Sequence, residues 1–317
     1  MPPRLSTFSI VAADLERAEW GVVVQSKFLS VGSVVPWAEA PAGAIATQAL
    51  ANMRYGPEGL ALLRRGLSAE EVVHRLTAED PQKEHRQVGV VDAHGHAAAF
   101  TGAECMEWAG HVVGDGFACQ GNILAGPDVV EEMARTMEAT KGDLADRLLA
   151  ALAAGQSRGG DRRGMQSAAL YVAKPEGSYG GTTDRYIDVR VDDHPSPIEE
   201  LRRVFHLYDM TLLNREDPAT LVDLAGEVVW GIQRDLRALR FYAGPADGTW
   251  NPETAKAWAT FLGVHNFENR ERSDGKAWPS VLGYLHVLAS PSRPSRGKAR
   301  KSSKSRARSG AKARRRS

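Results

Sequence analysis

Apolar residues in the first two hundred positions fall mostly into short runs of the length of β-strands. Residues 7–13 and 20–26 are β-branched and apolar, and the charged segment DLERAE lies between them, which predicts a hairpin of two buried strands. The same signal returns in the segments 87–92, 96–101, 109–113, 116–120, 166–174 and 185–192. The small-residue run AEAPAGAIATQALAN at 38–52 permits close packing or a close approach of the backbone to a ligand.

Helical periodicity separates these groups of strands. Residues 56–76 have apolar positions at helical spacing, with a break at Gly66-Leu67-Ser68, and Ser68 followed by Glu71 is the pattern of a capping box that opens a second helix. Two more helices are predicted at 127–140 and 142–155. The order of strands, helices, strands, helices and strands favours an antiparallel, layered α+β domain over a doubly wound parallel sheet.

A change of pattern at His194-Pro195-Ser196-Pro197 marks a domain boundary, because each X-Pro dipeptide disfavours regular structure. Beyond it we predict helices at 198–213, 220–242, 251–264 and 278–288. The predicted organisation is an N-terminal extension at 1–6, an α+β domain at 7–194, a small three-helix domain at 195–289 and a disordered basic tail at 290–317.

Charge is distributed unevenly between these parts. The chain has 317 residues and a formal net charge of +1, with 40 lysines and arginines and 39 acidic residues. Residues 290–317 hold twelve of the basic residues and no acid, so the other 28 basic residues face all 39 acids and residues 1–289 carry a net charge of −11. A basic tail of this kind suits contact with a polyanion, and the alternatives are a solubilising role or docking onto the acidic body.

Several classes of protein are excluded or disfavoured by composition. With 43% apolar and 25% charged residues, the chain is neither wholly disordered nor collagen-like. It has no run of 18 apolar residues for a membrane helix and no signal-peptide pattern, so we expect a cytoplasmic protein without membrane contact. Two cysteines are too few for a disulfide framework, and His94-Gly-His96 reads as a polar turn, so no metal or cofactor is expected.

A resemblance to a bacterial family covers most of the first 195 residues. It rests on TFSIVA, SKF, VGSVVPWA, TQALANMRYGPEGLALL, EHRQVGVVD, FTG, QGNILAG, GGDRRGMQSAAL and DRYIDVRVDDHP, which occur in this order. These segments are similar to domain-of-unknown-function family 1028, which is placed by similarity among the N-terminal-nucleophile hydrolases. The resemblance implies a four-layer α-β-β-α sandwich.

The resemblance also implies a catalytic group at the start of the first strand. In such hydrolases the first residue attacks an amide carbonyl while its own α-amino group acts as the base. Thr7 is the candidate, although MPPRLS precedes it where the family typically has only Met, so the role requires removal of residues 1–6. Lys27 would stabilise the developing charge, Ser26 would assist or, with Lys27 as base, replace Thr7, and Asn122 would hold the oxyanion.

Further polar residues lie in loops and at strand ends where a substrate could bind. The amides of Gln48 and Asn52 can orient an amide substrate, or they can cap turns. The charged candidates for binding a substrate are His85, Arg86, Asp161, Arg163 and Asp188. The alternative for this second group is a set of solvated ion pairs.

The C-terminal helical region resembles a second known module. Residues 229–263 are similar to the peptidoglycan-binding-like three-helix domain, with Gln233, Asp247, Gly248, Thr254 and Phe261 at that motif's spacing. The alternatives for this module are packing on the catalytic domain and homo-oligomer formation.

Two functions of different classes follow. The first is an amidohydrolase of the N-terminal-nucleophile type that acts on a small amide or peptide-like molecule. The second is a non-enzymatic scaffold that uses the helical module and the basic tail to contact cell-wall or other polyanionic polymer. A variant of the first, a wall-associated amidase, is disfavoured by the sequence of the N-terminus.

Overall fold

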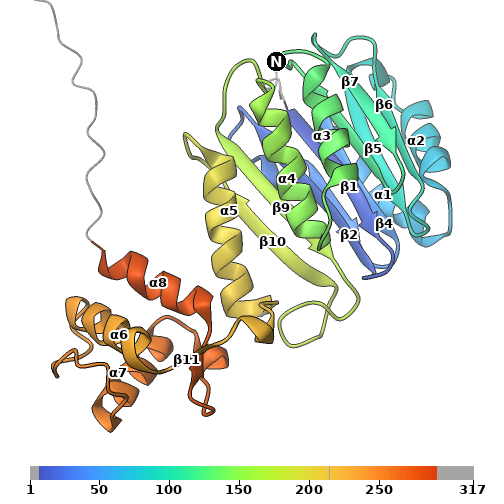
Figure 1. Ribbon diagram of the computed structural model, residues 1–317. Helices are drawn as coiled ribbons and strands as arrows, with labels where there is room; N and C mark the ends of the chain where they lie inside the picture. The colour runs from blue at the N-terminus through green and yellow to red at the C-terminus, as the bar shows by residue number, and fades with distance from the viewer. Residues whose placement is uncertain (1–6, 214, 291–317) are drawn as a thin grey trace, which may run out of the picture. The chain divides into compact units, whose positions relative to one another are not determined.

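The computed structural model describes residues 7–213 and 215–290. The chain divides into two compact units, Met1–Arg215 and Glu216–Ser317. Within the described residues, no helix is long and apolar enough to cross a membrane. The first unit is a mixed α+β structure with antiparallel sheets, as the order of elements predicted (Figure 1).

The larger sheet of the first unit has six strands in the order β10-β9-β2-β1-β8-β7. Their bounds are β1 Thr7–Asp14, β2 Glu19–Ser26, β7 Gly110–Gly114, β8 Phe117–Asn122, β9 Ser167–Ala173 and β10 Arg185–Val191. β1 pairs with β2 on one side and with β8 on the other, both antiparallel. The predicted hairpin of 7–13 and 20–26 is therefore confirmed, and β1 lies at the centre of the sheet.

The smaller sheet has four strands in the order β3-β4-β5-β6. They are β3 Pro36–Glu39, β4 Gly43–Ala49, β5 Arg86–Asp92 and β6 Ala97–Thr101. β4 lies within the small-residue run, and β3 begins before it and overlaps its start. Neither was predicted to be a strand, and in β4 this is because alanine and glycine have low β-propensity. Every residue of β4 is buried, so the small side chains serve the close packing that the run permits.

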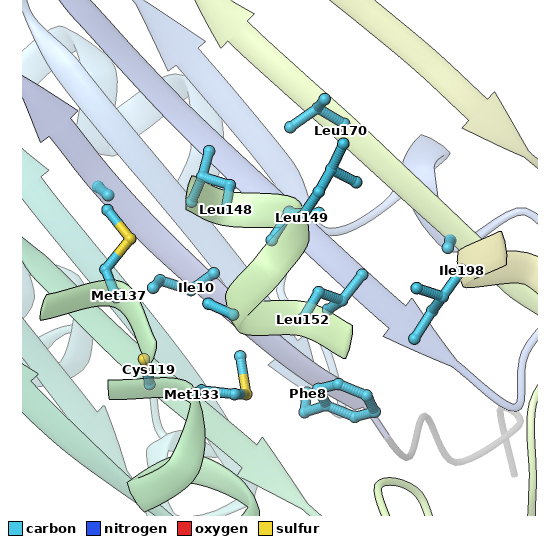
Figure 2. Close-up of a cluster of buried hydrophobic side chains, with 14 of the residues drawn as sticks. Phe8, Ile10, Cys119, Met133, Met137, Leu148, Leu149, Leu152, Leu170 and Ile198 are labelled. Atoms are coloured by element: carbon cyan, nitrogen blue, oxygen red, sulfur yellow. The ribbon is translucent and has the colours of Figure 1, made fainter. Parts of the chain in front are cut away.

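Five helices pack on the outer faces of the sheets. α3 (Asp128–Ala139), α4 (Leu144–Ser157) and α5 (Pro197–Tyr208) cover the six-stranded sheet, and α1 (Tyr55–Arg64) and α2 (Ala69–Ala78) cover the four-stranded one. Figure 2 shows Phe8 and Ile10 of β1 among the side chains of α3 and α4, including Met133, Leu148 and Leu152.

The inner faces of the two sheets pack against each other. Val11 of β1 and Val24 of β2 belong to the same buried cluster as Ala44 and Ala46 of β4 and Val91 of β5. Because side chains alternate between the faces of a strand, the odd-numbered residues of β1 point toward the other sheet and the even-numbered ones toward the helices. Thr7 and Ser9 are therefore directed into the space between the sheets.

The division between the units falls after α5, whereas the sequence placed the boundary before it, at 194/195. Ile198, Leu201 and Phe205 of α5 are buried in the same cluster as the strands and helices of the first unit. This apolar contact assigns α5 to the α+β unit. The helix predicted over 198–213 ends at Tyr208 and continues as a π-helical turn, Asp209–Leu213.

The second unit contains α6 (Gly226–Ala238), α7 (Pro252–Val264) and α8 (Pro279–Ala289), with the short antiparallel strands β11 (Val222–Asp223) and β12 (Lys276–Ala277). The helix predicted from residue 220 begins only at Gly226, because the residues before it form β11 and a bend. Short 3-10 helices occur at Val31–Ser33, Lys83–His85, Pro218–Thr220 and Glu268–Arg270.

Candidate functional site

Three of the predicted catalytic residues lie side by side at one end of the six-stranded sheet. In the register of the strands, Thr7 is opposite Ser26 of β2 and opposite Asn122 of β8. Residues that are directly opposite in a sheet share a face, so the three side chains point the same way. Thr7 Oγ1 donates a hydrogen bond to Ser26 Oγ at 3.1 Å, and all three residues are buried.

Gln48 reaches this group from the opposite sheet. Its Nε2 donates to the carbonyl oxygen of Thr7 at 3.3 Å and to Oε1 of Gln87 at 2.8 Å. Gln48 lies near the end of β4 and is fully buried. One predicted substrate-binding residue is thus part of the buried contact between the two sheets.

Gln87 of β5 fixes the orientation of the neighbouring amides. Its Nε2 donates to the carbonyl oxygens of Gly121 at 2.8 Å and Gly110 at 3.1 Å. A backbone carbonyl can only accept, so Gln87 Oε1 must be the acceptor for Gln48 Nε2 and for Asn122 Nδ2, the latter at 3.1 Å. The side-chain amide of Asn122 is therefore held with its nitrogen toward Gln87.

The network continues through Ser9 to Gln120. Ser9 Oγ donates to Gln48 Oε1 at 2.7 Å and accepts from Gln120 Nε2, also at 2.7 Å. Gln120 Oε1 is buried and has no hydrogen-bond partner in the described part of the chain. Gly89 provides the room for it, because a Cβ at Gly89 would lie 2.2 Å from Gln120 Oε1.

Ser9, Gln87 and Gln120 were not among the residues singled out from the sequence. The signal that could have found them is a polar residue at an inward-facing position of a strand that is otherwise buried. Such a side chain needs a buried partner, since an unpaired one costs about 1–3 kcal/mol.

Lys27 and the loop after α4 form a neighbouring group. The backbone N–H of Lys27 donates to Asp161 Oδ2 at 2.8 Å, and the exposed Lys27 ammonium donates to the carbonyl oxygen of Met165 at 3.2 Å. Asp161 is buried and forms an ion pair with Arg163 at 3.3 Å. Asp161 thus holds the backbone just beyond Ser26, and Arg163 contacts Asp161.

A cavity of about 260 Å³ lies beside Asn122. Its lining residues are Ala49, Leu50, His85, Glu104, Cys105, Met106, Asn122 and Ile123. His85 Nε2 and Glu104 Oε2 are 2.9 Å apart. Burial raises the pKa of Cys105 to about 11, so its thiol is protonated at neutral pH. Of the predicted substrate-binding residues, His85 lies on this cavity.

The other predicted substrate-binding residues lie elsewhere. Asn52 and Arg86 both donate to Asp80 Oδ2, at 3.1 and 2.9 Å, in a cluster below α1 that includes Tyr55. Burial alone would raise the pKa of Asp80, but the hydrogen bonds from Arg86 and its other neighbours outweigh it and hold that pKa far below its usual range. The polar side chains of this cluster therefore contact one another.

Asp188 is a further residue that does not join the site. It lies on β10, where it pairs with Arg190 at 2.9 Å and with Arg185 at 3.4 Å. These contacts match the ion-pair alternative. In the turn after β5, Asp92 Oδ1 accepts from the backbone N–H groups of His94 and His96, and residues 7–213 and 215–290 contain no group of three metal-ligating side chains.

In the second unit, the motif residues of the helical module hold a turn. Gln233 of α6 is fully buried and accepts from the N–H groups of Asp247 and Gly248 at 3.0 and 2.9 Å. Its Nε2 donates to Thr254 Oγ1 at 3.0 Å, and Asn251 caps α7 through the N–H of Thr254. The spacing of these residues is therefore explained by local structure.

Fold and site together define an α+β domain in which a threonine opens the central strand beside a serine and buried carboxamides. The chain belongs to the family of unknown function DUF1028, whose model matches residues 7–201. A peptidoglycan-binding-like domain, PG_binding_2, follows at residues 211–285. The resemblances inferred from the sequence are confirmed.

The chain is also similar to a solved structure. The crystal structure of protein SPO2555 from Silicibacter pomeroyi, a DUF1028 protein, has 32% sequence identity and a TM-score of 0.59. The similarity covers 64% of this chain and 89% of that one. No curated protein matches the chain.

Proposed function

We propose that the first unit is an amidohydrolase of the N-terminal-nucleophile type, acting on a small amide or peptide-like substrate, with Thr7 as the nucleophile. The observation that carries the proposal is the contact of 3.1 Å between the hydroxyls of Thr7 and Ser26, at the start of the central strand. Asn122 lies opposite Thr7 on the other side. A threonine hydroxyl and an amide side chain thus lie on one face of one sheet, which supports the proposed roles.

The packing of the unit supports this reaction class. Phe8 and Ile10 contact the helices on one side of β1, while Val11 contacts the second sheet, which carries α1 and α2 on its far face. These contacts support the four-layer α-β-β-α sandwich that the resemblance implies. A fold alone does not define a reaction, so the proposal rests on the site.

The chemistry requires a free α-amino group on Thr7. Thr7 Oγ1 would bond to the substrate's carbonyl carbon, and its proton would pass to the Thr7 amine and then to the leaving nitrogen as the C–N bond breaks. Water would then displace the acyl group from Thr7 Oγ1. One amide and one water give one carboxylic acid and one amine, and the hydroxyl is restored.

Neighbouring residues have supporting roles in this scheme. Ser26 Oγ orients the Thr7 hydroxyl, and Asn122, which is opposite Thr7 in the sheet, would contribute its amide N–H group to stabilising an oxyanion. Lys27 would add positive charge beyond Ser26. Thr7 is fully buried in the whole chain, so the proposal includes removal of residues 1–6 and an opening of the site. We expect the enzyme to be cytoplasmic and to form a homo-oligomer.

The roles of the hydroxyls can be tested by substitution. In a form that begins at Thr7, p-nitrophenyl acetate should acylate Thr7, and Thr7→Ala should abolish this labelling. Ser26→Ala should slow it without abolishing it. Thr182→Ala, which alters an exposed threonine on a loop, is the matched control and should label normally. Unchanged labelling of Thr7→Ala together with its loss in Ser26→Ala would transfer the nucleophile to Ser26.

A second function is favoured by the match at residues 211–285, namely a scaffold that contacts cell-wall polymer. Trp230 of α6 is 45% exposed, and the Arg234 guanidinium lies 5.2 Å from its ring centre, which is a surface suited to sugar contact. The whole chain should then be retained on peptidoglycan, and Trp230→Ala should lower retention while Tyr179→Ala, at another exposed aromatic residue, should not. Absence of retention would contradict this function.

The basic tail at 290–317 was expected to contact polyanions, and residues 291–317 lie outside the described residues. We propose that this segment adds polymer contact of an electrostatic kind. Retention of the whole chain on immobilised DNA should then fall steeply with salt, because bound counterions are released on association.

A further inference from the structure

The cavity beside Asn122 is the place where the bulk of a substrate would lie. Asn122 lines it and is directly opposite Thr7 in the β1–β8 register. Opposite residues of antiparallel strands have Cα atoms about 4.5–5.5 Å apart, so Asn122 connects the wall of the cavity to the residue next to it in the sheet, Thr7. The inference below rests on the proposed function and gives it a substrate class.

The cavity is lined by apolar side chains and by polar side chains that contact other groups of the protein. Leu50, Met106, Ile123 and Ala49 supply hydrocarbon and thioether surface. His85 Nε2 and Glu104 Oε2 are 2.9 Å apart, so the polar side chains of His85 and Glu104 contact each other. Cys105 is neutral because burial raises its pKa to about 11, and its Sγ donates to the carbonyl oxygen of Arg86.

The size of the cavity limits what it can hold. Its volume of about 260 Å³ is below the roughly 300–1,000 Å³ of sites for drug-sized ligands. It therefore suits one compact group.

The backbone of the cavity wall has an uncommon conformation at two positions. Ala49 and Ile123 both line the cavity and have φ values of 70° and 53°, in the left-handed region, which is costly for a β-branched residue such as Ile123. Each directly follows a carboxamide residue of the buried network, Gln48 or Asn122. Ile123 is also held by its N–H bond to the Met106 carbonyl oxygen at 3.0 Å.

We propose that this cavity is a specificity subsite for a compact, branched, uncharged apolar group attached to the amide that Thr7 attacks. The group can belong to the acyl side or to the amine side of that amide, since both present the same chemistry to the wall. Asn122 then contacts the amide, and Leu50 and Met106 enclose the apolar group.

Binding can be followed on the whole chain without catalysis. The chain contains seven methionines, so ¹³C-methyl labelling gives a small set of signals in which Met106 is assigned from Met106→Leu. We would titrate 4-methylpentanamide and N-(3-methylbutyl)acetamide, which carry the branched group on the acyl and amine sides, and compare succinamate and 5-aminopentanamide as charged amides.

We expect at least one branched amide to shift the Met106 methyl signal and to bind at least about tenfold more tightly than either charged amide. Leu50→Phe narrows the cavity and should weaken this binding about tenfold, whereas Leu15→Phe, at an exposed leucine at the other end of β1, should not. Charged amides that bind equally well, or a Met106 signal that no amide moves, would overturn the inference.

The same titration on Thr7→Ala separates this inference from the proposed function. If the branched amides bind to Thr7→Ala and Thr7 of the wild-type protein is never acylated, the subsite is supported and the hydrolase is contradicted. Acylation of Thr7 together with a preference for charged amides would support the hydrolase and contradict the subsite.

Discussion

The residues around Thr7 form a polar group at one end of an otherwise apolar contact between two sheets. The hydrogen bonds of Gln87 to the carbonyl oxygens of Gly110 and Gly121 determine the direction of the bonds that follow through Gln48 and Asn122. Such a network stabilises one arrangement when its members are satisfied, and it becomes costly when one donor is removed.

Gln87→Glu tests this directional argument. The substitution replaces a donor with a second acceptor against the carbonyl oxygens of Gly110 and Gly121, so the free energy of unfolding should fall by about 3 kcal/mol. Urea denaturation at pH 7 measures the change. Gln82→Glu, on the exposed turn before β5, is the control and should change the free energy of unfolding by no more than about 0.5 kcal/mol. Equal effects of the two substitutions would contradict the network.

Asp80 should make the free energy of unfolding depend on pH in the acid range. Its pKa is lowered in the folded protein, so its contribution to stability is present above its unfolded pKa of about 4 and is lost as the pH falls below that value. Wild-type protein should therefore lose more stability between pH 4 and pH 2 than Asp80→Asn does. Urea denaturation at several pH values provides the comparison, and parallel losses in the two proteins would contradict it.

The sequence identified part of the site and could not identify the rest. Thr7, Ser26 and Asn122 were chosen for their chemistry and their family resemblance, and the strand register brings them together. Asn52 and Arg86 are equally polar, but they bind Asp80. Which partner a polar side chain meets depends on contacts between strands far apart in the chain, and those contacts have no local signal.

At the scale of elements, local signals predicted the helices and most strands. The strand β4 was missed because its alanines and glycine carry no strand signal, although the space between two closely packed sheets favours small side chains. The strand β3 was missed as well; it is short and begins with a proline. α5 was predicted as a helix of the C-terminal domain, whereas it belongs to the first unit. Its apolar face packs on β9 and β10, which a helical pattern alone does not reveal.

Ser68 at the start of α2 gives a prediction for an element boundary. Ser68 Oγ accepts from the N–H of Glu71 at 3.3 Å, and Glu71 Oε2 accepts from the N–H of Ser68 at 2.9 Å, so the predicted capping box is confirmed. Ser68→Ala should lower the free energy of unfolding by about 1 kcal/mol.

Ser196 provides the matched control, because it precedes α5 and its side chain makes no capping hydrogen bond. Ser196→Ala should therefore cost clearly less than Ser68→Ala in the same urea denaturation measurement. A larger loss from Ser196→Ala would mean that side-chain capping does not determine the stability of these helix starts.

At the scale of the whole molecule, the chain joins a DUF1028 unit to a peptidoglycan-binding-like unit. The net charge of +1 is the sum of an acidic part, residues 1–289, and a segment with twelve basic residues at 290–317. The proposed catalytic residue lies near the other end of the chain, at Thr7. We therefore assign the proposed reaction to the first unit, and the proposed polymer binding to the second unit and the basic segment.

Intact-mass analysis of the purified protein, before and after exposure to p-nitrophenyl acetate, shows whether Thr7 becomes the first residue and acts as a nucleophile. We expect a mass that corresponds to a chain beginning at Thr7, and a further increase by one acetyl group that peptide mapping assigns to the Thr7 hydroxyl. A chain that keeps residues 1–6 and gains no acetyl group at Thr7 would contradict this expectation.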